Sequence, residues 1–104
     1  MIRVKMLAQG GDLVGMTVKG HAGADESGKD IVCAAVSSAV YMTANTVTDV
    51  CCIKADIEVE DGWFSLKIDA KDADACRTVL KGFSLHMQQM QQQYPQYIEF
   101  KTEV

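Results

Sequence analysis

Two short turns divide much of this chain into pairs of alternating segments, and they limit the folds that it can adopt. The turns are Gly10-Gly11 and Asp61-Gly62, each flanked on both sides by residues that alternate between apolar and polar. A two-residue turn rich in glycine joins neighbouring antiparallel strands, so each pair is predicted to form a β-hairpin. The four predicted strands are residues 2–8, 13–20, 53–60 and 63–70.

Two longer segments are typical of helices. Residues 31–52 are small and apolar on nearly all sides, which predicts a helix covered by the sheet, by another helix or by a second subunit. Residues 72–93 carry an apolar stripe with glutamines opposite, and Pro95 ends this helix. Residues 97–101 then form a last strand. The apolar stripe consists of Cys76, Val79, Leu80, Phe83, Met87, Met90 and Tyr94.

The predicted order is β-β-α-β-β-α-β. Since hairpins give antiparallel pairs, we expect an α+β fold in which two helices pack on one mainly antiparallel sheet. The 104 residues are expected to form a single domain, residues 1–104, without a linker or repeat. An apolar content of 48% supports an ordinary core, so neither a metal nor a cofactor is expected.

Charge and cysteine content narrow the classes of function. The formal net charge of 10 − 14 = −4 disfavours direct binding of nucleic acid and favours a basic partner. The four cysteines show neither a disulfide framework nor zinc-ligand spacing, which points to a reducing cytoplasm. The apolar stretch 31–53 contains Asn45 and Asp49, which argues against a membrane span.

The residues most typical of catalysis are His21 and Cys33, separated by a glycine-rich loop. Asp30 is predicted to cap the following helix, which would place Cys33 in its first turn near free backbone N–H groups. The helix dipole stabilises a charge there by about 0.3–1 kcal/mol, less than the roughly 1.36 kcal/mol of one pKa unit. A thiolate therefore needs a neighbouring imidazole, and His21 is the candidate within reach along the chain.

Several nearby residues have two possible roles. Asp30 either caps the helix only or also orients His21. Ser37, one helical turn after Cys33, and Ser38 beside it either contact the thiolate or substrate or only permit close helix packing. Gly20 is either a hinge of the loop or a turn residue. A lone helix cysteine is also commonly a small buried apolar residue, so the pair by itself does not establish catalysis.

The motif resembles that of a known family. Gly20-His21-Ala22 together with residues 28–37, Gly-Lys-Asp-Ile-Val-Cys-Ala-Ala-Val-Ser, is similar to the signature of the ribosomal-processing cysteine proteases, the Prp family. The resemblance covers the whole chain in length, element order and the glutamine-rich second helix. It implies a homodimeric endopeptidase with a catalytic dyad formed by His21 and Cys33.

The same resemblance implies the substrate. Family members remove the N-terminal extension of a bacterial large-subunit ribosomal protein, the twenty-seventh of that subunit, after two bulky aromatic residues. One alternative is a non-catalytic acidic dimer that acts as a ribosome-assembly or binding factor, and this would explain the charge but not the placement of His21 and Cys33. Another is a redox sensor based on Cys51 and Cys52.

Overall fold

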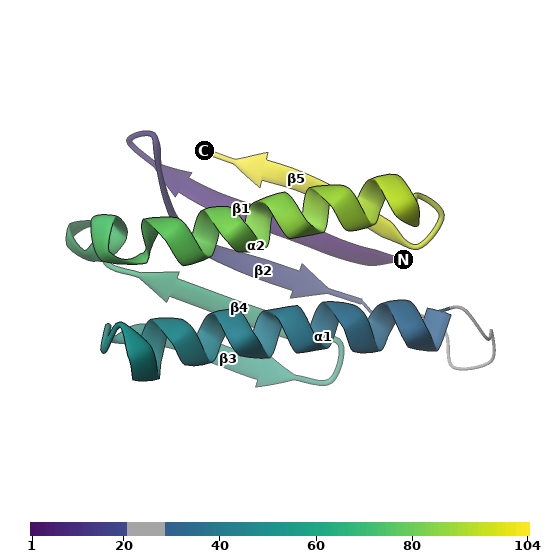
Figure 1. Ribbon diagram of the computed structural model, residues 1–104, viewed down its shortest axis with the longest axis horizontal. Helices are drawn as coiled ribbons and strands as arrows, with labels where there is room; N and C mark the ends of the chain where they lie inside the picture. The colour runs from purple at the N-terminus through teal and green to yellow at the C-terminus, as the bar shows by residue number, and fades with distance from the viewer. Residues whose placement is uncertain (21–28) are drawn as a thin grey trace.

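The computed structural model describes residues 1–20 and 29–104, and within them it shows one five-stranded sheet with two long helices. Figure 1 shows both helices lying across the same face of the sheet, side by side and running in opposite directions. The predicted order and the α+β class are confirmed. The elements are β1 (Ile2–Gln9), β2 (Asp12–Lys19), α1 (Lys29–Asn45), η1 (Thr46–Val50), β3 (Ala55–Glu60), β4 (Trp63–Ile68), η2 (Ala70–Asp72), α2 (Ala73–Gln93) and β5 (Ile98–Glu103).

The strands follow the order β3-β4-β2-β1-β5. Both predicted hairpins form as antiparallel pairs, and β2 also pairs with β4 in antiparallel fashion. Only β1 and β5 are parallel, because α2 carries the chain back along the sheet before β5 begins. The sheet is therefore mainly antiparallel, with β3 and β5 at its two edges.

The core lies between the sheet and the helices. One side of each of β1, β2 and β4 is apolar and meets the valine stripe of α1 and the predicted stripe of α2. In α2 the predicted stripe is confirmed, with Val79 and Tyr94 half-buried at its margin. Buried members of this core include Ile2, Val4, Met6, Met16, Leu66, Val32, Val36, Val40, Cys76, Leu80, Phe83 and Met87.

The first helix ends earlier than its composition predicts. Its regular part stops at Asn45, and a wider π-helical turn, η1, continues to Val50. The Thr43 and Thr46 hydroxyls donate hydrogen bonds of 2.8 and 2.7 Å to the carbonyls four residues earlier, an arrangement that bends helices. By length and composition alone residues 31–50 could cross a membrane, yet the valine stripe of α1 packs in the core of this fold.

The strand β3 departs from the prediction of a half-buried strand. It begins at Ala55, not at residue 53, and every residue after Ala55 is exposed. Ile57 and Val59 lie on the side of the sheet that carries the helices, but they are 40% and 60% exposed. The strand order explains this exposure. Because β3 is the outermost strand, α1 covers its apolar side only in part.

Candidate functional site

Cys33 is the fifth residue of α1 and lies half-buried in a groove between that helix and the β3–β4 hairpin. The groove has a volume of about 320 Å³, room for one or two side chains of a bound peptide. Its lining comes from the end of β2, the exposed side of α1 and the hairpin. We call it the Cys33 groove. It is lined by Val18, Gly20, Cys33, Val36, Ser37, Val40, Tyr41, Val59, Glu60, Asp61, Gly62, Trp63 and Phe64.

Gly20 holds the end of β2 against the hairpin turn. Its backbone N–H donates a 2.8 Å hydrogen bond to the carbonyl of Gly62. Its φ of +91° is unfavourable for residues with a side chain, and a Cβ atom here would lie 2.4 Å from the carbonyl oxygen of Met1. Of the two roles considered for Gly20, the conformation supports a required turn residue beside the groove.

The groove combines an apolar interior with an acidic rim. Buried Val36 and Phe64 lie on its inside, while Tyr41 is 56% exposed. Glu60 and Asp61 are its charged residues, and no lysine or arginine in the described part of the chain contributes to its lining. A bound peptide with an apolar side chain next to a basic one would match this surface.

The structure places the other predicted site residues differently. His21 lies outside the described residues. Ser37 is exposed and lines the Cys33 groove, whereas Ser38 lines a second groove between α1 and α2. The two serines therefore do not act on one site, because neighbouring residues on a helix point about 100° apart.

The prediction that Asp30 caps the helix is wrong. Asp30 lies inside α1, after Lys29, where the described part of the helix starts, and Cys33 lies beyond the first turn of that part. The free N–H groups of a helix are those of its first turn, and the backbone N–H of the fifth residue already bonds within the helix. Donors for an oxyanion would thus come from residues that precede Cys33 by two positions or more. The local signal was ambiguous because aspartate is favoured both at the cap and within the first turn.

The remaining cysteines differ in exposure. Cys76 is fully buried, as predicted, and burial raises the pKa of its thiol, with smaller contributions from Cys51 and Asp72. Cys51 is half-buried, but Cys52 is exposed and adopts a φ of +56° where the chain leaves η1. Cys52 therefore lies outside the core.

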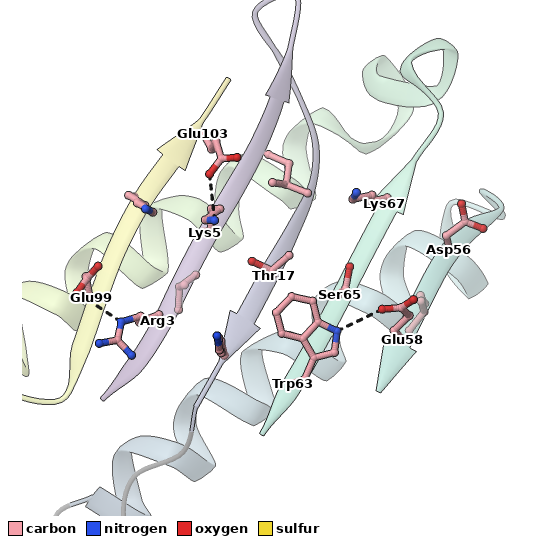
Figure 2. A pocket seen from close by; sticks show the side chains of 15 residues that line it. Arg3, Lys5, Thr17, Asp56, Glu58, Trp63, Ser65, Lys67, Glu99 and Glu103 are labelled. Carbon is pink, nitrogen blue, oxygen red and sulfur yellow. Dashed lines mark hydrogen bonds and ion pairs between the residues drawn. The ribbon is translucent and has the colours of Figure 1, made fainter. Parts of the chain in front are cut away.

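A larger hollow, of about 980 Å³, covers the open face of the sheet on the side away from the helices (Figure 2). Basic residues of the central strands lie between acidic residues of β3 and β5. Lys5 pairs with Glu103 at 3.0 Å, and the Trp63 Nε1–H donates to Glu58 at 3.3 Å. Trp63 lines both this hollow and the Cys33 groove.

Metal chemistry finds no support in the described residues. Across 1–20 and 29–104, no three His, Cys, Asp or Glu side chains come together as a metal site.

Comparison with known proteins decides the family. The family model for cysteine protease Prp matches residues 1–99. The chain belongs to this family. No curated protein matches the sequence closely.

Solved structures agree with the Prp fold. Prp from S. aureus in complex with a substrate peptide has a TM-score of 0.88 and 24% identity, with 99% of this chain and 100% of that chain covered. The same protease with a covalently linked product peptide has a TM-score of 0.87 and 24% identity, with the same coverage. SMU.848 from Streptococcus mutans reaches 0.81 at 24% identity over 98% of this chain and 93% of that one.

Proposed function

We propose that the protein is a cysteine endopeptidase in which Cys33 is the nucleophile and His21 is the general base. The observation that carries the proposal is the position of Cys33 in a chain of the Prp family. Its side chain is half-buried on the wall of a groove that is open to solvent and is large enough for peptide side chains. A purely structural cysteine is normally buried, as Cys76 is.

In the proposed reaction His21 takes the proton of the Cys33 thiol, and the thiolate attacks the carbonyl carbon of the scissile peptide bond. The tetrahedral intermediate collapses to a thioester, and the C–N bond breaks. The leaving amine receives the proton held by His21. Water, deprotonated by the same imidazole, then hydrolyses the thioester and regenerates the thiol. The S. aureus relative with a covalently linked product peptide supports a covalent route.

We further propose that the substrate is the N-terminal extension of the twenty-seventh large-subunit ribosomal protein. The family match and the substrate-peptide complex of the S. aureus protease support a peptide substrate from ribosome processing. Two local features agree with a basic ribosomal protein: the net charge of −4 and the carboxylates of Glu60 and Asp61 at the groove. Cytoplasmic location, where ribosomes are assembled, belongs to the same proposal.

A homodimer is the assembly that we expect. Residues 31–48 contain no charged side chain, yet Ile31 and Met42 are 70% and 66% exposed. A second hollow of about 860 Å³ lies between α1 and α2, with Met42 and Phe83 among its lining. An uncharged face with protruding apolar side chains next to a hollow suits a second copy of the chain, because a two-fold interface must complement itself.

The decisive experiment is cleavage of a synthetic peptide that spans the processed extension. Changing Cys33 to Ala should reduce kcat/KM by at least about a thousandfold and leave the thermal unfolding midpoint nearly unchanged. Cys51→Ala is the matched control, since that thiol is also half-buried but does not line the groove. Full activity of the Cys33 variant would refute the mechanism. Binding of the peptide without cleavage by the unaltered protein would support the non-catalytic alternative.

A further inference from the structure

The free edge of the sheet begins at the Cys33 groove. β3 is the outermost strand, and in the described part of the chain no other strand pairs with its outer side. Val59 and Glu60, at the end of β3, belong to the groove lining. An extended peptide that enters the groove would therefore meet an unpaired strand.

The register shows which backbone groups face outward. A Cβ on Gly15 would lie 2.1 Å from the carbonyl oxygen of Leu66, which places the Leu66 carbonyl on the β2 side of β4. The residues of β4 that bond to β3 are then its alternate members, Ser65 and Lys67, which are opposite Glu58 and Asp56. By the same alternation, the N–H and C=O groups of Ile57 and Val59 point away from β4, toward the free edge.

The side chains of β3 divide into two rows. Asp56 and Glu58 lie on the open face of the sheet, as Figure 2 shows, and Glu60 continues this alternate row to the rim of the Cys33 groove. Ile57 and Val59 lie on the helix side, and both are exposed. A strand added at this edge would place alternate residues beside three carboxylates and the intervening residues beside exposed apolar side chains.

We propose that the peptide substrate binds by extending the sheet at the free edge of β3, with basic residues on the open face and apolar residues toward α1. This inference rests on the proposed function, because the occupant is the peptide that Cys33 would cleave. The edge sets the direction of the peptide and its side-chain register, and the groove then receives the residue next to the scissile bond. Main-chain hydrogen bonds supply affinity and the two rows supply specificity.

A second copy of the chain fits this edge poorly. If two β3 strands paired, the carboxylates of Asp56, Glu58 and Glu60 on one copy would lie beside those on the other. Like charges directly opposite in a sheet are destabilising. A peptide of a basic ribosomal protein brings the opposite charge to the same row. The charge pattern therefore selects the peptide over self-pairing.

Binding to the inactive Cys33→Ala variant tests the inference separately from the chemistry. The probe is a fluorescein-labelled synthetic peptide of the processed extension, measured by anisotropy, with single N-methyl groups placed along its backbone. Edge pairing predicts that Kd rises about five- to tenfold at every second residue on one flank of the scissile bond and changes little between them. Uniform or irregular effects would overturn it.

Two changes in the protein complete the test. Ile57→Pro removes an outward N–H without removing a bond to β4, so Kd should rise about fivefold while the unfolding midpoint is nearly retained. Glu58→Lys should weaken binding about fivefold and shift the preference toward peptides with Glu in place of Lys. Glu99→Lys, with the same charge change on β5, is the control.

The outcomes separate the two proposals. Periodic binding effects together with failure of the unaltered protein to cleave would refute the protease mechanism and retain edge binding. Cleavage without periodic effects, and with equal responses of Glu58→Lys and Glu99→Lys, would refute edge binding and retain the protease. If Ile57→Pro does not fold, the methylation series decides by itself, because it leaves the protein unchanged.

Discussion

Replacing Gly20 by alanine should destabilise the fold more than the same change at Gly10, although both glycines have positive φ. Gly10 has a φ of +60°, and a Cβ atom there would have nothing within 4 Å. Gly10→Ala therefore measures the free-energy cost of the backbone conformation alone. Gly20, at +91°, adds a contact of 2.4 Å with the carbonyl oxygen of Met1. The pair therefore separates the conformational cost from the steric one.

The magnitude follows from these contacts. A residue with a side chain in the left-handed region costs about 1–2 kcal/mol, and both variants bear this cost. In Gly20→Ala the Met1–Ile2 peptide must also move, which disturbs the 2.8 Å hydrogen bond from the Ile2 N–H to the carbonyl of Tyr97. Losing that bond and straining the start of β1 adds about 1–2 kcal/mol. We expect totals of about 1–2 kcal/mol for Gly10→Ala and about 2–4 kcal/mol for Gly20→Ala.

Urea unfolding followed by circular dichroism measures both free energies under identical conditions. Because Gly20 lines the Cys33 groove and bonds to the hairpin turn, peptide cleavage should also fall in Gly20→Ala under conditions where the variant is folded. Gly10→Ala should keep full activity, since the β1–β2 turn lies outside the groove lining. Equal losses of stability in the two variants, within about 0.5 kcal/mol, would refute the steric argument at Gly20.

Two further predictions concern a buried thiol and the uncharged part of α1. Burial raises the pKa of the Cys76 thiol in the folded protein, so the thiol ionises at a lower pH in the unfolded chain than in the folded one. The free energy of unfolding should therefore decline as the pH rises above about 8.5, the ordinary pKa of a thiol. Urea titrations from pH 7 to 10 should show that the free energy of unfolding declines less steeply with pH in Cys76→Ala than in the unaltered protein. An identical slope in the two proteins would contradict the assignment of this decline to Cys76. Met42→Glu should convert the expected dimer into monomers in sedimentation equilibrium, whereas the exposed control Gln96→Glu should not; a dimeric Met42 variant would exclude this face.

The sequence predicts the elements well because their periodicities are strong. Alternation on both sides of two tight turns gives the hairpins, and the stripe from Cys76 to Tyr94 gives the buried side of α2. The expectation that one side of β3 is buried is wrong, because alternation distinguishes the two faces of a strand without showing whether another element covers either face. The exposure of Ile57 and Val59 follows from the position of β3 at the edge, which depends on pairings far apart in sequence.

The site was predictable only in part. Cys33 could be singled out from its motif, but Ser38 and Ser37 could be assigned to different grooves only after the packing of α1 was known. The acidic rim was missed altogether, since Glu60 and Asp61 lie 27 and 28 positions after Cys33 and look like an ordinary hairpin end in the sequence. Their role follows from the hydrogen bond between Gly20 and Gly62, which brings that hairpin to the end of β2.

The charge pattern bears on which face of the molecule suits the proposed dimer. On the open face, one row crosses the sheet from Glu60 through Lys19 and Arg3 to Glu99, so the two ends of this row are acidic and its centre is basic. A two-fold axis in the plane of the sheet and through the middle of this row would place acidic ends over acidic ends and the basic centre over itself, which disfavours dimerisation in that arrangement. The helix side carries no charge from residue 31 to 48 and meets no such penalty. A dimer formed through the helices would also leave the free edge of β3 available to a peptide, so that self-association and substrate binding need not compete.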